Sequence, residues 1–235
     1  MYKVVWFARY TPDRPKEEAD RHWEQVHGPL FAEVPGVERY VQSHVTGTLP
    51  AVGGYSEDST YFDGYSCAWF TDQAAFVAAM DSPEWAAVGE DSANAFDNDW
   101  FTGMSAHIRE VTQIEGPSTP YKVVYVVNFR DDLETAAADD HWTNVHGPLF
   151  HDVPIDRYVQ NHVVSAIGRE GENDDPVHFS GFSECWFDNE AQFLEALATP
   201  GWAAASVDSP NVFDESRMWG AALRDVVIKE RQPAA

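Results

Sequence analysis

A ten-residue segment occurs twice in this chain, and this internal repeat constrains the fold more than any other feature. Residues 22–31 read HWEQVHGPLF and residues 141–150 read HWTNVHGPLF, so eight of the ten positions are identical. Repeat periods of about 20–50 residues are typical of solenoids. The offset here is 119 residues, which indicates two domain-sized copies of one folding unit.

The repeat extends beyond this segment and sets the boundaries of the two units. The sequence RYVQ at 39–42 returns at 157–160, and SPEW at 82–85 returns as TPGW at 199–202. A chain of 235 residues can hold two domains of roughly 100–120 residues each. Gly, Pro and Ser are frequent just before residue 121, which is typical of a linker. We expect a first repeat at 1–113, a linker at 114–120 and a second repeat at 121–235.

The composition narrows the class of partner. A formal net charge of −24 argues against nucleic acid and anionic membranes, because both would be repelled. No apolar run approaches the 18 residues of a membrane-spanning helix, and no signal peptide precedes Tyr2. Cys67 and Cys185 form no zinc-binding pattern. We expect a soluble cytoplasmic protein that acts on a small molecule.

The hydrophobic pattern of the first half predicts four strands and two helical regions. Apolar and β-branched runs predict strands at 2–8, 38–45, 64–70 and 104–111. A spacing of three to four residues predicts a helix over 15–27 that Gly28-Pro29 ends, a second over 73–81 and a short one from Pro83. The 46–63 and 164–180 segments are expected to be long loops. This βαββαβ order, present in both halves, predicts α+β ferredoxin-like repeats.

Polar residues that both halves retain are the candidate site. Between the matching islands the halves have drifted apart, so their retention indicates a constraint on both copies. Strand alternation places Tyr40, Gln42 and His44 on one face. The retained pairs are His22/His141, Trp23/Trp142, His27/His146, Tyr40/Tyr158, Gln42/Gln160 and His44/His162.

One position differs chemically between the halves. Cys67 aligns with Glu184, and aromatic residues flank both positions on the same face: Tyr65 and Trp69 in the first half, Phe182 and Trp186 in the second. If each half has a pocket, the two pockets are not equivalent. Glu184 is then an additional acid or base in the second pocket alone.

The repeated motif resembles a known family. A His-Trp-x-x-x-His-x-Pro-Leu helix end, followed by Arg-Tyr-Val-Gln-x-His on the next strand, is similar to the EthD family of dimeric α+β barrel proteins. The resemblance implies that two ferredoxin-like sheets meet in one barrel, which here a single chain would build as an intrachain pseudo-dimer. It places the family's motif histidine on His27 and His146 and the strand histidine on His44 and His162. Family members include a methylmuconolactone isomerase, decarboxylases of anthraquinone-type acids and an ether-degradation protein, and the enzymes generally need no cofactor.

These residues permit proton-transfer chemistry on a flat apolar compound. Histidine exchanges protons near pH 7, so we expect His27 with His44, and His146 with His162, to form acid–base pairs. Tyr40 or Tyr158 would donate to a developing oxyanion. The remaining candidates would bind substrate, the aromatic ones as walls: His22, Trp23, Gln42, Tyr65, Trp69, His141, Trp142, Gln160, Phe182 and Trp186. We expect an isomerase, cyclase, lyase or decarboxylase with no cofactor and no metal.

Other interpretations remain open from the sequence. A single histidine at a helix end is more often structural than catalytic, and tryptophans are core residues first. A metal- or haem-dependent oxidative enzyme is one alternative, although His22 and His27 are five residues apart and should not share a helix face. A non-catalytic protein that binds an apolar ligand is another. The sequence leaves open the substrate, the number of working pockets and whether the tandem chain forms a homodimer.

Overall fold

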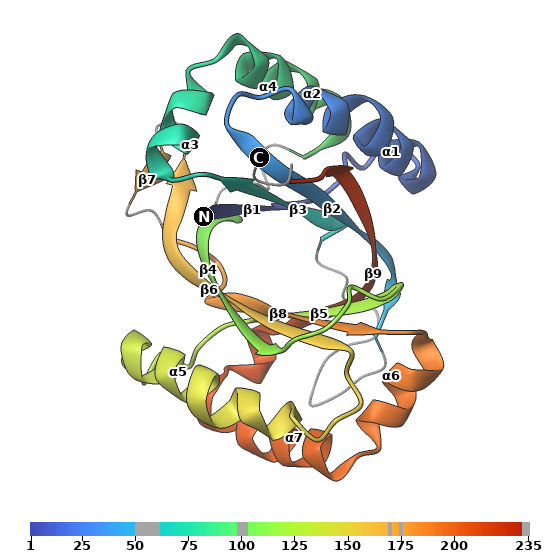
Figure 1. Ribbon diagram of the computed structural model, residues 1–235, viewed down its shortest axis with the longest axis vertical. Coiled ribbons are helices and arrows are strands. Elements are labelled where there is room, and N and C mark those ends of the chain that lie inside the picture. Colours follow the sequence, from blue (N-terminus) through green and yellow to red (C-terminus); the bar gives the residue numbers. More distant parts are fainter. Residues whose placement is uncertain (50–61, 98–102, 169–170, 174–175, 232–235) are drawn as a thin grey trace.

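Each half of the chain folds as the predicted βαββαβ unit. The computed structural model describes residues 1–49, 62–97, 103–168, 171–173 and 176–231 (Figure 1). The first half contains β1 (Tyr2–Ala8), α1 (Lys16–His22), a π-helical turn (Trp23–His27), α2 (Gly28–Ala32), β2 (Val37–Thr48), β3 (Gly64–Phe70), α3 (Gln73–Met80), α4 (Pro83–Ala95) and β4 (Ser105–Ile114). The second contains β5 (Tyr121–Val127), α5 (Thr135–His141), a π-helical turn (Trp142–His146), a 3-10 turn (Gly147–Phe150), β6 (Arg157–Gly168), β7 (Gly171–Asn173), β8 (Gly181–Phe187), α6 (Glu190–Leu197), α7 (Pro200–Val212), a 3-10 turn (Glu215–Arg217) and β9 (Trp219–Lys229).

Local sequence signals explain where the later helices begin. The Asp72 carboxylate accepts a hydrogen bond from the backbone N–H of Ala75 at 2.9 Å, which satisfies one of the free donors at the start of α3. The Ser82 hydroxyl caps α4 in the same way, and Pro83 occupies its first turn, where a missing N–H costs nothing. The second half uses Asn189 and Thr199 as the corresponding caps.

Eight antiparallel strands close into a barrel, as the resemblance implied. Around the barrel the strand order is β4-β1-β3-β2-β9-β5-β8-β6, and β6 pairs back to β4. The last strand of each half therefore lies between two strands of different halves: β4 pairs with β1 and β6, and β9 with β5 and β2. This order is unchanged when the two halves are exchanged, so the barrel has a pseudo-twofold axis. Figure 1 shows the ring of strands end-on, with the helices of each half covering opposite outer sides.

Alternation along the strands separates an inner from an outer core. Val41 and Val45 of β2 point into the barrel, together with side chains such as Phe7 and Phe182. Tyr40, next to Val41 in β2, points outward to the helices and packs with Phe31. Each side of the sheet thus has its own apolar cluster, and a residue's parity along its strand decides which one it joins.

Two predicted boundaries differ from the structure. The helix predicted over 15–27 does not end at Gly28-Pro29 but continues through α2 to Ala32. The 164–180 segment is not entirely loop, because β6 runs to Gly168 and β7 pairs back onto it. Most of the predicted 46–63 loop lies outside the described residues. Within the described part of the chain, no helix is long and apolar enough to cross a membrane.

Candidate functional site

A π-helical turn aligns the two histidines of the repeated motif. The backbone N–H of Gly28 donates to the carbonyl of Trp23, five residues earlier, instead of the fourth-previous carbonyl of an α-helix. Residues five apart therefore lie on one side of the helix, and His22 and His27 face the same carboxylate. The expectation that their spacing separates them is wrong, because it assumed an unbroken α-helix. Pro29 does not stop the helix, since it falls in the first turn of the segment after the bulge, where no N–H is needed.

The retained glutamine holds this π-helical turn from the sheet. Gln42 Nε2 donates to the Trp23 carbonyl at 2.9 Å, and a Cβ on Gly28 would lie only 2.6 Å from that nitrogen. Gly28 is thus required for the close approach, a role the sequence did not suggest. In the second half Gln160 donates to the Trp142 carbonyl at 2.9 Å, again beside a glycine, Gly147. Gln42 and Gln160 are fully buried and do not line the cavities described below, so they position the motif.

An aspartate from the last helix binds both histidines of the motif. In the first half Asp91 Oδ2 lies 3.0 Å from His27 Nδ1, and its Oδ1 lies 2.9 Å from His22 Nε2. The second half repeats this arrangement: Asp208 lies 3.0 Å from both His146 Nδ1 and His141 Nε2. Sequence reasoning missed both carboxylates. The signal was present, because Asp-Ser-x-Asn at 91–94 returns at 208–211 beside the Asn-x-Phe-Asp repeat.

Burial and the aspartate together determine the protonation state and the tautomer of the motif histidine. Burial lowers the pKa of His27, and the hydrogen bond to Asp91 opposes that shift only in part. The same causes lower the pKa of His146. Near pH 7 we therefore assign a neutral ring whose Nδ1–H donates to the aspartate, which leaves Nε2 as the basic atom. Nε2 of His27 has no hydrogen-bond partner among the residues that the structure describes.

Each motif histidine lines a cavity between the helices and the outer face of the sheet. The cavities have volumes of about 140 Å³ in the first half and 80 Å³ in the second, and each is partly open to solvent. Their walls are largely aromatic. The repeat-related lining residues are Trp23/Trp142, His27/His146, Phe31/Phe150, Tyr40/Tyr158, Ser66/Ser183, Trp85/Trp202, Ser92/Ser209 and Phe96/Phe213.

A tyrosine from β2, and its copy from β6, lines the same cavity as the motif histidine. Tyr40 lines the first cavity with His27, and Tyr158 lines the second with His146. Burial raises the pKa of both phenols, so they stay protonated and can donate a hydrogen bond. Gln160 Nε2 donates to the Tyr158 oxygen at 3.1 Å, which fixes that oxygen while its own proton remains available for a ligand.

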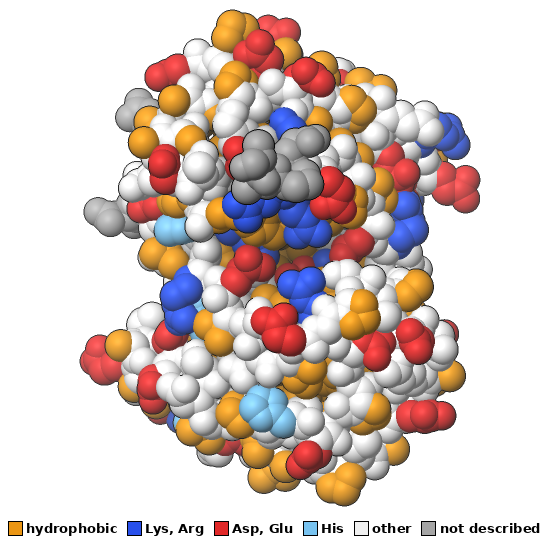
Figure 2. All heavy atoms as spheres, in the orientation of Figure 1, with side chains coloured by type: hydrophobic (Ala, Val, Ile, Leu, Met, Phe, Trp, Pro, Cys, Tyr) orange, Lys and Arg blue, Asp and Glu red, His pale blue; other side chains and the backbone are white. Residues whose placement is uncertain are grey.

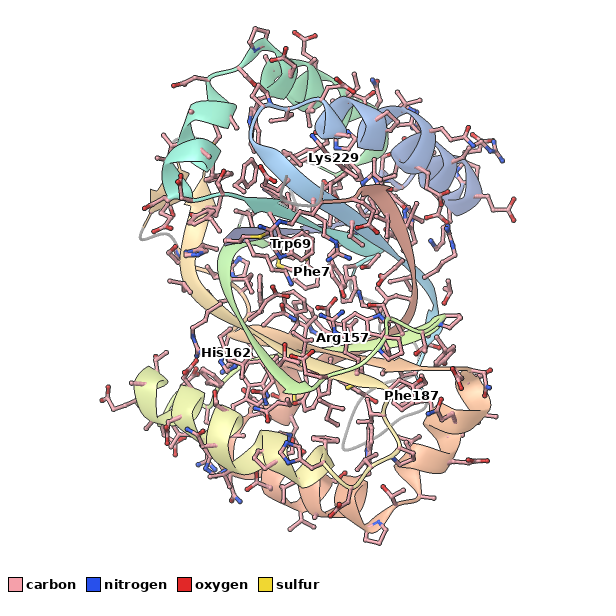
Figure 3. The ribbon with its side chains drawn as sticks, in the orientation of Figure 1. Phe7, Trp69, Arg157, His162, Phe187 and Lys229 are labelled. Carbon is pink, nitrogen blue, oxygen red and sulfur yellow. The ribbon has the colours of Figure 1, made fainter. Side chains whose placement is uncertain are left out.

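The strand histidine does not join the site, and the predicted histidine pairs are wrong in geometry. His44 Nδ1 lies 2.9 Å from Asp20 Oδ1, its Nε2 lies 3.2 Å from Gln42 Oε1, and its ring packs on Trp23. His162 is held equivalently by Asp139 at 2.6 Å and lies outside the barrel beside α5 (Figure 3). Both rings are 1% exposed and line neither cavity, and their ring nitrogens are hydrogen-bonded within the protein.

Cys67, Glu184 and the aromatic residues that flank them lie on the side of the sheet opposite the histidine cavities. They alternate with the cavity-lining Ser66 and Ser183 and so point into the barrel, where Figure 3 shows the labelled Trp69 and Phe7 inside the ring of strands. Glu184 therefore does not share a cavity with His146, contrary to the expectation of an extra acid or base there. It bonds to Lys122 at 2.6 Å, Tyr65 at 2.7 Å and Asn161 at 2.9 Å. The predicted walls that lie in the barrel instead are Tyr65, Trp69, Phe182 and Trp186.

Each cavity offers a metal ion one histidine nitrogen from the described residues. Nε2 of His27 and of His146 each face a cavity and could act as one ligand. Among the described residues, no three His, Cys, Asp or Glu side chains gather in a manner suited to a metal ion. The geometry thus presents an oriented imidazole, a protonated phenol and aromatic walls.

Known proteins agree with this architecture. The EthD domain matches residues 11–99 and 130–216. A candidate monooxygenase from Fusobacterium nucleatum superposes with a TM-score of 0.57 at 11% identity, covering 100% of this chain and 95% of that one. An anthrone oxidase-like protein gives 0.57 at 15% identity over 100% and 95%. A candidate monooxygenase from Lactobacillus acidophilus gives 0.54 at 10% identity over 96% and 94%.

At these identities the superpositions show a shared fold alone, and no curated protein matches the sequence. The two domain matches together cover most of the chain and fall one in each half, on either side of the 114–120 segment. Each includes the π-helical turn, its histidines and the aspartate that binds them. This chain belongs to the EthD family and carries two copies of the EthD domain.

Proposed function

We propose that this protein is a cofactor-independent enzyme that removes and returns a proton on a flat hydrophobic compound, with His27 or His146 as the general base. The observation that carries the proposal is the Asp–His arrangement: Asp91 and Asp208 each bind Nδ1 of the motif histidine at 3.0 Å. A carboxylate on Nδ1 fixes the tautomer that leaves Nε2 basic, and it stabilises the imidazolium formed when Nε2 takes a proton.

The remaining groups of the cavity suit the other half of such a reaction. Removing a proton beside a carbonyl or phenol leaves charge on an oxygen, and a protonated Tyr40 or Tyr158 can donate to that oxygen. Aromatic walls such as Trp142 and Phe213 favour a planar, apolar ring system over an aliphatic or charged compound. Substrates of this kind include hydroxylated polycyclic aromatics, their carboxylic acids and unsaturated lactones. Isomerisation, cyclisation and decarboxylation all begin or end with the proposed proton transfer.

The test measures the proton transfer itself, whichever product is formed. The protein is incubated in D₂O with a panel of hydroxyanthrones, hydroxyanthraquinone carboxylic acids and unsaturated lactones, and mass spectrometry records deuterium uptake and product. We expect exchange into at least one compound. The double variant His27→Gln/His146→Gln should slow it by about 10²–10⁴-fold, the usual contribution of a general base. Unchanged exchange in that variant would refute the assignment.

Matched variants separate the base from its environment. His151→Gln removes an exposed histidine just beyond the motif and should leave the rate unchanged. Asp208→Asn keeps the shape of the side chain but can no longer stabilise an imidazolium, so we expect a loss of about 10- to 100-fold in the second half's activity. The single variants His27→Gln and His146→Gln report which cavity works. If both work equally, each single variant keeps about half of the rate, which follows from their independence.

Oxygenation is the second candidate, because two of the structural neighbours carry monooxygenase names and a third is anthrone oxidase-like. The same base would then form a carbanion that molecular oxygen oxidises. Oxygen uptake in step with product, measured with an oxygen electrode on the same compound panel, would favour this candidate. Equal product yield under nitrogen would favour isomerase or lyase chemistry.

A further inference from the structure

We propose that one mouth of the barrel binds a small oxyanion, a carboxylate or phosphate group, clamped between Arg39 and Arg157. This site lies inside the ring of strands, on the opposite side of the sheet from the histidine cavities. A small cavity of about 30 Å³ is lined there by charged and aromatic side chains from both halves. Figure 2 shows Lys and Arg side chains gathered over the middle of this face, around the barrel opening.

The charges of the mouth are paired by repeat. Lys3, Arg39 and Glu110 in the first half correspond to Lys122, Arg157 and Asp225 in the second, and Glu184 has no charged counterpart. The lining therefore holds four cationic and three anionic side chains. A local excess of positive charge is notable in a chain with a formal net charge of −24. Since the halves have drifted elsewhere, the repeated cations indicate a constraint on this opening.

The carboxylates of the mouth are fully used within the protein. Glu110 accepts from Lys3 at 2.9 Å and from the Trp69 indole at 3.2 Å. Asp225 accepts from Lys122 at 2.9 Å and from Ser43 at 2.7 Å. Glu184, described above, has three partners of its own. The two lysines are 2% exposed and are consumed by these bonds, so neither the acids nor the lysines need an external partner.

The guanidinium groups, by contrast, have most of their donors unused by the described residues. Each guanidinium carbon lies over an indole ring, that of Arg39 4.7 Å from the Trp69 centroid and that of Arg157 5.0 Å from the Trp186 centroid. Arg157 makes one hydrogen bond, to the Ser118 hydroxyl at 3.0 Å, and its buried Nε has no partner among the described residues. Arg39 makes no hydrogen bond to any described residue, and its nearest carboxylate, an exposed Glu230, is 3.7 Å away.

Stacking on an indole presents the edge of a guanidinium, where its N–H donors lie in one plane. This planar edge matches the two oxygens of a carboxylate or phosphate, and a buried donor without an acceptor is costly. Because Arg39 and Arg157 are related by the pseudo-twofold axis, they approach the opening from opposite halves. One oxyanion at the axis would satisfy both, with the lysines beneath adding attraction but no direct bond.

The test uses sodium malonate and sodium phosphate as probes, with sodium chloride at matched ionic strength as the reference. Isothermal titration calorimetry measures the affinity, and thermal unfolding measures the accompanying stabilisation. We expect malonate, phosphate or both to bind and raise Tm above the chloride reference. Binding of malonate alone would support a carboxylate ligand, and binding of phosphate alone a phosphate ligand. Failure of both to bind at millimolar concentration would overturn the proposal.

Variants locate the binding. The double variant Arg39→Gln/Arg157→Gln should weaken binding by at least about tenfold, as expected for loss of charge-assisted hydrogen bonds. The matched control is Arg109→Gln/Arg224→Gln, a second repeat-related pair that is exposed and pairs with Asp139 and Glu24. It removes the same charge and should change the affinity by less than about threefold, since neither residue lines the mouth. An equal loss in the control would refute the clamp, because only net charge would then matter.

Replacing an arginine of the clamp by lysine distinguishes bidentate hydrogen bonding from simple charge attraction. Arg157→Lys keeps the charge but loses the planar pair of donors, so we expect affinity to fall several-fold while circular dichroism stays unchanged. Wild-type affinity in this variant would contradict the bidentate clamp. If the glutamine double variant does not fold, Arg39→Lys/Arg157→Lys takes its place, with the same expected direction.

Discussion

The two halves of the chain match each other on the outer face of the barrel sheet but differ on its inner face. On the outer face, the two halves hold the same cluster: Asp91 and Asp208 bind the motif histidine at the same 3.0 Å distance. On the inner face, Cys67 in one half corresponds to Glu184 in the other, and both border the same cavity. The outer clusters lie under separate helices, whereas the inner residues share one space around the pseudo-twofold axis.

The difference follows from that shared space. An outer residue meets only its own half, so both copies can keep the same side chain. An inner residue near the axis meets its counterpart, and two buried glutamates there would repel each other. With Cys67 facing it, Glu184 instead accepts from Lys122 of its own half and from Tyr65 of the other. Burial beside Glu184 in turn raises the pKa of the Cys67 thiol to about 12, which keeps it uncharged.

Removing the unmatched acid tests the inner face and should have the largest effect on stability. Glu184→Ala leaves Lys122 with Asp225 as its one charged partner beside the Ser43 hydroxyl, and it removes the acceptor that the Tyr65 hydroxyl and the Asn161 amide use among the described residues. We expect the free energy of unfolding, measured by urea denaturation at pH 7, to fall by about 3 kcal/mol. The counterpart change, Cys67→Ala, should cost only about 1 kcal/mol. Equal costs would show that the inner face is as symmetric as the outer one.

Adding a methyl group at the π-helical turn tests whether the outer face is as equivalent as it looks. A Cβ on Gly28 or Gly147 would lie within 2.9 Å of a glutamine amide, so the alanine variants must displace Gln42 in the first half and both Gln113 and Gln160 in the second. We expect each to lower the free energy of unfolding by about 1–3 kcal/mol, and by similar amounts in the two halves. Gly89→Ala is the control, because a Cβ there meets nothing within 4 Å and helix propensity favours alanine. It should stabilise by about 0.5–1 kcal/mol.

The sequence predicted the features of the fold that depend on local hydrophobic periodicity. The βαββαβ order and the shared face of Tyr40, Gln42 and His44 both follow from patterns of two or 3.6 residues. The closed barrel was predicted from the family motif. Its pairings of β4 with β6 and of β9 with β2 join residues that are far apart in the chain. Local pattern alone does not specify such pairings.

The sequence predictions were wrong where tertiary contacts overrode a local pattern. The π-helical turn breaks the 3.6-residue period, so His22 and His27 were placed on different faces. Sharing a sheet face was taken as sharing a site, but His44 points toward the helices and is used up by Asp20. Asp91 is 64 residues from His27, and only the repeated Asp-Ser-x-Asn pattern pointed to it.

The smallest expected effect is a pH dependence of stability that the outer face should produce and the inner face should not. Burial lowers the pKa of His27 and His146 below the value near 6.5 of an unfolded chain, so below that pH the unfolded state binds more protons. Stability is therefore complete above pH 6.5 and falls as the pH drops from there toward the lowered values. Attraction by Asp91 and Asp208 opposes the desolvation of the rings, which keeps the effect small. The aspartates lose their own stabilising ionisation only below about pH 4, so the two windows separate.

Urea denaturation at pH 7, 6 and 5 measures this dependence. We expect the wild-type free energy of unfolding to fall over that range, and to fall less in His27→Gln/His146→Gln. Some slope should remain in that variant, because the pKa values of His107 and His162 are also lowered by burial. Glu184→Gln should leave the slope unchanged, since Lys122 and Lys3 hold the pKa of that carboxyl far below the range tested. If the histidine variant lost as much stability as the wild type, the motif rings would not be neutral at pH 7, and the proposed base would already carry its proton.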